Sequence, residues 1–154
     1  MRSCDSPPLL VGLSLGGYAS LAYAGRHGDR IAGVMLSGCS TEIKGKPLGL
    51  YGRTAERVTR WLRVGGDRWH VVTDMFAALA GYSPLADLRR LALPVFLVNG
   101  RRDPLRFDEW RYRRAAPYAH VTVVPRAGHD VNSHAPAAFT ATLFDALETL
   151  RRPA

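Results

Sequence analysis

The chain has 154 residues, of which 47% are hydrophobic and 22% are charged, and this composition fits one ordinary globular domain. Its formal net charge is +8, but the arginines that carry it are scattered rather than clustered among aromatic or glycine residues, which argues against nucleic-acid binding. No apolar run approaches the roughly 18 residues of a membrane span, so we expect a cytoplasmic protein that does not bind membranes. Two cysteines without metal-ligand spacing argue against a disulfide framework and a metal site.

The first predicted element is a strand over residues 8–12, and a helix over residues 16–27 follows it directly. The pattern G-x-S-x-G joins them, centred on Ser14. In this setting the pattern indicates a nucleophile elbow, a sharp turn that holds a strained serine with its hydroxyl above the sheet. We expect Gly12 and Gly16 to be required, because larger side chains would clash where strand and helix pass close together. The alternative is a glycine-rich turn that happens to contain a serine.

A second strand is predicted over residues 31–36. The segment 41–87, which follows, has no further strand pattern. Spaced apolar residues within it predict two amphipathic helices, over residues 54–64 and 67–80.

Two further predicted strands end beside an acid and a base. The apolar runs over residues 94–99 and 120–125 are followed by Asp103 and His129, respectively. Because open α/β sheets place their sites at the carboxyl ends of parallel strands, we expect both side chains at one edge of the sheet. A serine nucleophile needs a base within hydrogen-bond reach and an acid that orients the base. The remaining predicted helices cover residues 107–115 and 136–149.

The chain order Ser14, Asp103, His129 is the order of the α/β-hydrolase triad. With the elbow and the two strand ends that carry it, the chain resembles the lid-bearing serine hydrolases of the α/β-hydrolase family, over residues 8–150. The resemblance implies a partial α/β-hydrolase fold: one domain over residues 1–154, with an open parallel sheet of about four strands and flanking helices.

The resemblance also implies an activity and its residues. Ser14 would attack an ester-type carbonyl, His129 would act as the base, and Asp103 would hold the imidazole tautomer. The backbone N–H of Leu15 would offer one donor to the oxyanion. No cofactor is implied, and the expected partner is a small-molecule substrate.

In such hydrolases an insertion at the place of residues 41–87 forms a lid over the serine. The resemblance therefore implies a lid-like helical insertion whose apolar side chains contact an acyl group, and the candidates are Trp61, Trp69, Met75 and Phe76. Ordinary packing of these helices onto the sheet is an equally good interpretation.

The chain departs from the family in one respect. The family has four strands and two helices before the elbow, whereas thirteen residues precede Ser14 here. A loop in that part supplies the second oxyanion donor, and its loss costs about 10²–10³ in turnover. The alternative function is therefore a catalytically impaired, N-terminally truncated remnant or an interaction module. The departure also predicts that residues 9–13 form an exposed edge strand through which the protein self-associates.

Other residues are weaker candidates for these roles. Ser37 lacks flanking glycines on both sides, and six other acids and histidines fall in helical patterns, in the insertion or in loops. These are Asp87, Asp108, Asp130, His27, His70 and His134. Arg2, the apolar residues from Leu9 onward and Ala22-Tyr23-Ala24 imitate a secretory signal, but the elbow explains the same residues better.

Overall fold

The computed structural model describes residues 6–45, 74 and 77–151. The chain divides into two compact units, Met1–Thr41 with Pro84–Ala154, and Glu42–Ser83. Within the described part of the second unit, the Ser83 hydroxyl donates to Glu42 Oε2 at 3.2 Å. The predicted helix over residues 54–64, most of the one over residues 67–80, and all four proposed lid side chains lie outside the described residues. The lid stays a prediction.

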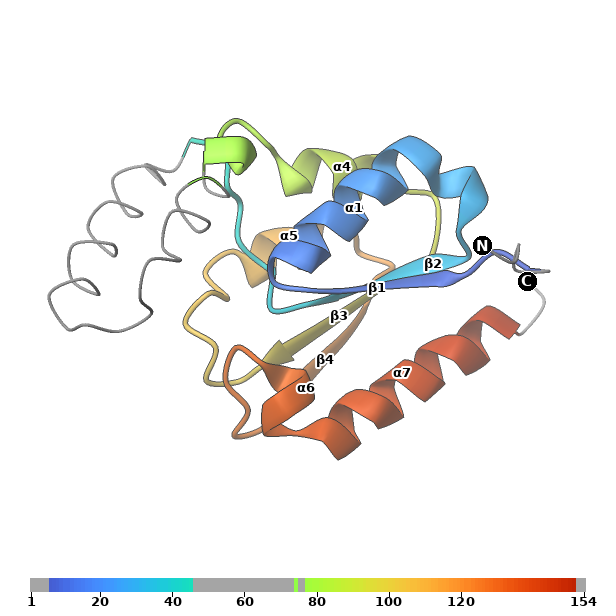
Figure 1. Cartoon of the computed structure of the whole chain (residues 1–154), viewed down its shortest axis with the longest axis vertical. Helices are drawn as coiled ribbons and strands as arrows, with labels where there is room; N and C mark the ends of the chain where they lie inside the picture. The colour runs from blue at the N-terminus through green and yellow to red at the C-terminus, as the bar shows by residue number, and fades with distance from the viewer. Residues whose placement is uncertain (1–5, 46–73, 75–76, 152–154) are drawn as a thin grey trace, which may run out of the picture. The chain divides into compact units, whose positions relative to one another are not determined.

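A parallel sheet of four strands, in the spatial order β1-β2-β3-β4, forms the centre of the first unit (Figure 1). The strands are β1 (Leu9–Leu13), β2 (Gly33–Ser37), β3 (Val95–Gly100) and β4 (His120–Val124). Each lies where the sequence predicts a strand, with its ends shifted by two residues at most. The predicted fold class is confirmed.

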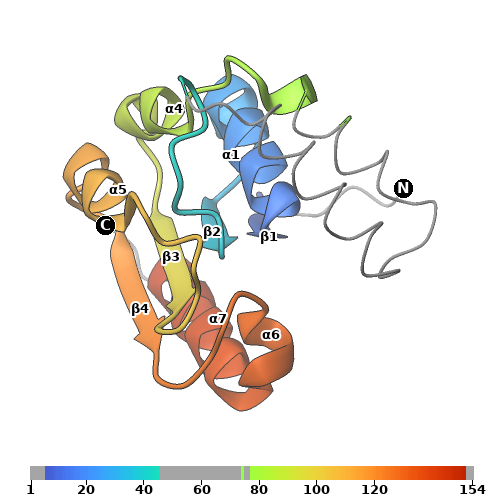
Figure 2. The ribbon, with the colours of Figure 1, turned by 90° about the vertical axis from the view of Figure 1, so that its left-hand side faces the viewer.

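Helices cover both faces of this sheet, as Figures 1 and 2 show. On one face lie α1 (Leu15–His27), α4 (Pro84–Arg90) and α5 (Glu109–Ala115), and on the other lie α6 (Val131–His134) and α7 (Pro136–Arg151). A short 3₁₀ turn, η1 (Gly28–Arg30), follows α1. None of the helices in the described ranges is long and apolar enough to cross a membrane.

Two hydrophobic cores, one on each face, explain why the central strands are continuous apolar runs until their last residues. Val95 and Leu97 of β3 lie in the core beneath α1, α4 and α5, whereas Phe96 and Val98 lie in the core beneath α6 and α7. Alternate residues of a strand point to opposite faces, so a strand covered on both sides needs a continuous apolar run.

The helices α4 and α6 are absent from the sequence prediction. In α4 only Leu85 and Leu88 are fully buried apolar side chains one turn apart. One such pair is too short a repeat to reveal a helix by periodicity. The four residues of α6 carry a single buried side chain, that of Val131, so this turn leaves no pattern at all.

Strand β1 lies at an edge of the sheet. It pairs with β2 on one side, and no strand in the described part of the chain pairs with its other side. Its sequence is LLVGL, without a charged residue, and Val11 is 40% exposed. An apolar edge of this kind offers unpaired N–H and C=O groups to a strand of another chain.

We expect the protein to self-associate along this edge and Val11→Lys to reduce the association, because a charge on an edge strand opposes pairing. Sedimentation velocity over a range of concentrations measures the effect. The matched control is Thr122→Lys on β4, the opposite edge strand, which should leave association unchanged. A wild-type monomer at high concentration, with slow amide exchange across Leu9–Leu13, would show that another segment covers the edge.

Candidate active site

Ser14 is the turn residue between β1 and α1. Its φ of 51° and ψ of −118° place a non-glycine residue in a region that costs about 1–3 kcal/mol. The turn is held from both sides: the Ser14 N–H donates to the Ser37 carbonyl at 2.8 Å, and the Ser14 carbonyl accepts the N–H of Gly17 at 2.9 Å. Ser14 is the N-cap of α1, but its side chain makes no capping hydrogen bond. The hydroxyl is thus not engaged by the helix that it precedes.

Glycines allow this turn, but only one of the two glycines that the sequence predicts is required. A Cβ at Gly12 would lie 2.5 Å from the carbonyl carbon of Gly16 and would overlap its oxygen. A Cβ at Gly17 would lie 2.5 Å from Cys39 Sγ, whereas one at Gly16 would meet nothing within 4 Å. The predicted requirement at Gly12 is confirmed. The one at Gly16 is wrong, because the space beside Gly16 in the first helical turn is open, whereas Gly17 faces the side chain of Cys39.

The two elbow glycines therefore predict opposite effects of the same substitution. We expect Gly12→Ala to destabilise the fold by about 1–3 kcal/mol or more, because the added methyl group collides with backbone. We expect Gly16→Ala to stabilise the fold by roughly 0.5–1 kcal/mol, because alanine favours the helix and has room there. Urea denaturation of both variants measures the difference. Equal free energies of unfolding would contradict the close contact at Gly12.

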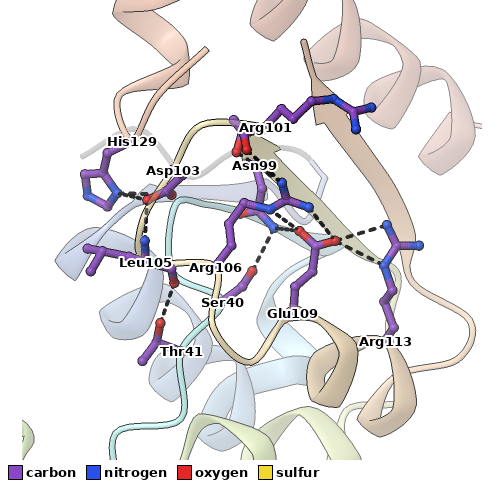
Figure 3. Close-up of polar contacts among 11 residues, drawn as sticks. Ser40, Thr41, Asn99, Arg101, Asp103, Leu105, Arg106, Glu109, Arg113 and His129 are labelled. Carbon is purple, nitrogen blue, oxygen red and sulfur yellow. Dashed lines mark hydrogen bonds and ion pairs between the residues drawn. The ribbon is translucent and has the colours of Figure 1, made fainter. Parts of the chain in front are cut away.

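The acid and the base predicted after β3 and β4 are hydrogen-bonded to each other. His129 Nδ1 lies 3.2 Å from both carboxylate oxygens of Asp103, and Asp103 Oδ1 also accepts the N–H of Leu105 at 2.8 Å (Figure 3). The Asp103 side chain is fully buried, whereas the His129 ring is 26% exposed. With Nδ1–H donated to the carboxylate, Nε2 is the nitrogen left to accept a proton.

The loops that carry this pair pack backbone against backbone. Arg102 N–H donates to the Ala127 carbonyl at 2.9 Å. A Cβ at Gly100 would lie 2.5 Å from the Ala127 oxygen and would overlap the oxygen of Gly128. The glycine that ends β3 thus permits the contact between the loop of Asp103 and the loop of His129.

Ser14 and His129 both lie beside the end of β2. The residue after Ser37 is Gly38, which has a φ of 61°, and a Cβ there would lie 3.1 Å from Cε1 of the His129 ring. Ser37 is also the residue whose carbonyl holds the Ser14 N–H. Among the described residues no hydrogen bond joins Ser14 to His129. Such bonds often form only when substrate is bound.

Leu15, predicted to offer an oxyanion donor, is the first residue of α1. The first backbone N–H groups of a helix have no partner within the helix, so they are available to an anion.

Two further nucleophile-type side chains lie next to the elbow, and both are buried. Ser37 is fully buried, and its hydroxyl has no hydrogen-bond partner within the described ranges. Burial, and secondly the charge of Asp103, raise the pKa of the Cys39 thiol to about 12. Cys39 is therefore a neutral thiol inside the core.

The alternative acids and bases lie in other surroundings. Asp108 Oδ1 accepts a hydrogen bond from Arg111 at 3.4 Å, and the carboxylate of Asp87 packs against Gly25 of α1.

The ring of His134 accepts the Gly128 N–H at 3.2 Å, and His27 lies against Tyr23 on α1. Asp130 precedes α6, and His70 lies outside the described residues. No group of three potential metal ligands occurs in the part of the chain that the structure describes.

Sequence reasoning missed a buried polar network next to Asp103. Asn99, Arg106 and Glu109 form its centre (Figure 3). In the sequence Arg106 and Glu109 look like exposed charges at the start of a helix. The only hint is Asn99, a lone polar residue near the end of an otherwise apolar strand.

Comparison with known proteins agrees with this architecture. A sequence model described as alpha/beta hydrolase family matches residues 2–142. A search of curated proteins gives no match.

Many solved structures are similar in fold. MenH from S. aureus is 17% identical with a TM-score of 0.73, and the match covers 96% of this chain and 70% of that one. NosK from Streptomyces actuosus is 20% identical with a TM-score of 0.73, covering 96% and 71%. A thermophilic esterase from Thermogutta terrifontis is 23% identical with a TM-score of 0.70, covering 95% and 66%. The chain thus spans about two thirds of these proteins, and at such identities the likeness concerns the fold alone.

Proposed function

The chain belongs to the α/β-hydrolase family, and on that premise we propose that it is a serine hydrolase that cleaves an ester or related acyl bond of a small, partly apolar substrate. One observation carries the proposal: the buried Asp103 is hydrogen-bonded to His129, whose ring lies against the strand end that also holds the strained Ser14. Nucleophile, base and acid in this relation are the minimum that serine-dependent acyl transfer requires.

In the proposed reaction Ser14 Oγ attacks the ester carbonyl while His129 Nε2 takes the hydroxyl proton. Asp103 stabilises the imidazolium that forms, and the Leu15 N–H donates to the developing oxyanion. His129 then gives its proton to the leaving alcohol, and the acyl group remains on Ser14. A water molecule, activated by the same base, hydrolyses this acyl-enzyme and restores the serine hydroxyl.

The substrate class is proposed from similarity and composition. The structural neighbours include a protein described as an esterase. Four large apolar residues of the insertion, Trp61, Trp69, Met75 and Phe76, would favour an apolar acyl group if the insertion covers the serine. No cofactor enters this chemistry.

A second candidate function is that of an interaction module that keeps the triad residues without turnover. The apolar edge of β1, which has no partner strand among the described residues, favours it, since such an edge recruits a strand of another chain. The two functions differ in whether Ser14 is reactive.

We expect a fluorophosphonate probe to label the protein at Ser14, so that Ser14→Ala abolishes labelling. His129→Ala should slow labelling by about 10²–10⁴, because the serine then lacks its base. Rates of labelling, read on denaturing gels with peptide mapping of the adduct, measure both effects. The matched control is Ser37→Ala, which should react as the wild type does.

Unchanged labelling of the Ser14→Ala variant, or an adduct on Ser37, would contradict the assignment. A wild-type protein that is folded, as judged by circular dichroism, but does not react would favour the interaction module.

A further inference from the structure

Glu109 is a buried carboxylate that gathers three side chains. It begins α5 and is 8% exposed. Its Oε2 accepts Arg106 Nε and Asn99 Nδ2, each at 2.8 Å, and its Oε1 accepts Arg106 Nη2 at 3.0 Å and Arg113 Nη2 at 3.2 Å. The Arg106 pair is bidentate, the geometry in which an arginine fixes a carboxylate most firmly. One carboxylate therefore joins strand β3, the loop after it and helix α5 (Figure 3).

This carboxylate is charged despite its burial. Burial alone would raise the pKa of Glu109, but hydrogen bonds from Arg106 and Asn99, with the charge of Arg106, lower it below its ordinary value. A charged group of this kind inside a protein is weak support for stability, because apolar residues of similar size often do as well. Its role is better sought in geometry.

Arg106 ties this carboxylate to the loop that carries Asp103. Its Nη1 donates to the carbonyl of Arg101 at 3.3 Å and lies 3.5 Å from that of Gly100. The Arg106 side chain thus links the end of the loop back to its beginning at Gly100 and Arg101. The hydrogen bond with Glu109 is the main cause that raises the pKa of Arg106, and the charge of Asp103 contributes.

Asn99 ties the network to the segment after β2. Its side chain is fully buried, and Nδ2 donates to Ser40 Oγ at 2.8 Å as well as to Glu109. Its Oδ1 has no hydrogen-bond partner among the described residues. An unsatisfied buried acceptor of this kind lowers the stability of the fold by about 1–3 kcal/mol. An unpaired buried oxygen next to two well-made bonds indicates that the amide is there for what its Nδ2 connects.

The loop is fastened to that segment at two further points. The Asp108 N–H donates to the Ser40 carbonyl at 3.1 Å, and the Thr41 hydroxyl donates to the Leu105 carbonyl. Leu105 is the residue whose N–H bonds Asp103 Oδ1. A displacement of the loop would thus move the carboxylate that faces His129.

We propose that Glu109 and Arg106 are positioning residues, which hold the loop over residues 101–108 so that both Asp103 oxygens face His129 Nδ1. The effect on reactivity rests on the proposed hydrolase function. The effect on the Asp103–His129 hydrogen bond does not, and it can be measured separately.

The test compares Glu109→Gln, which keeps the size of the side chain and removes its charge, with Arg111→Gln. Arg111 lies on the same helix and pairs with Asp108 rather than with the network, so it is the matched control for loss of one charge on α5. The first readout is the downfield proton resonance of His129 Nδ1–H in the NMR spectrum, which reports the hydrogen bond to Asp103. The second is the rate of fluorophosphonate labelling.

We expect Glu109→Gln to shift the Nδ1–H resonance upfield or broaden it by exchange, as Asp103→Asn should. Labelling at saturating probe should slow by up to about 10²-fold, the cost of misplacing a group by about 1 Å, with little change in the probe concentration for half-maximal rate. Arg111→Gln should keep the resonance and the rate. Arg106→Lys should be intermediate, because lysine keeps the charge but cannot make the bidentate pair.

If the Glu109→Gln variant is too unstable to study, the double variant Glu109→Leu with Arg106→Leu takes its place, because it removes both charges of the ion pair together. Loss of the resonance in that folded variant supports the proposal. A normal Nδ1–H resonance and labelling rate in either variant, or an equal loss in Arg111→Gln, overturns it. A wild-type protein that shows the resonance but is never labelled, with the resonance lost in Glu109→Gln, leaves the positioning role standing and rejects the hydrolase.

Discussion

The candidate site depends on contact between bare backbone segments at the carboxyl ends of the strands. At the elbow, the end of β1 touches the first turn of α1 where only the hydrogen of Gly12 intervenes. At the end of β3, Gly100 allows the loop of Asp103 to contact the loop of His129 in the same way. A side chain at Gly12 or Gly100 would push the adjoining elements apart by about the width of a methyl group. The polar groups on those elements would then be too far apart to interact.

Most of the framework follows from the sequence, because the strands are continuous apolar runs and parallel strands share one edge. Asp103 and His129 each follow such a run, so their approach was predictable without knowledge of any contact. The roles of Gly16 and Gly17 were not, since both belong to the same motif and only the position of Cys39 tells which of them faces a neighbour. The network of Asn99, Arg106 and Glu109 was also hidden. Its members lie 59 or more residues after Ser40 in the chain, and a charged residue looks the same in a sequence whether it is buried or exposed.

The two faces of the described sheet differ in the kind of interaction beside the acid. Beneath α7 the packing is apolar, from Met35 to Ala146. On the opposite face, the apolar core beneath α1 and α4 gives way near the strand ends to a charged network around Glu109. An apolar contact tolerates small sliding, whereas a bidentate ion pair fixes distance and direction together. The more directional interaction therefore lies next to the residue whose orientation matters most.

The missing cap on α1 has a practical consequence. A serine at a helix N-cap ordinarily stabilises the helix by about 1 kcal/mol through its oxygen, so that its removal disturbs the fold. Here the backbone of Ser14 turns away from that role, and no capping bond is lost when the hydroxyl is deleted. A chain with alanine at this position should keep the native architecture while lacking the proposed nucleophile. The Ser14→Ala variant is therefore suited to binding a ligand without cleaving it, so that the intact ligand can be identified by crystallography or mass spectrometry.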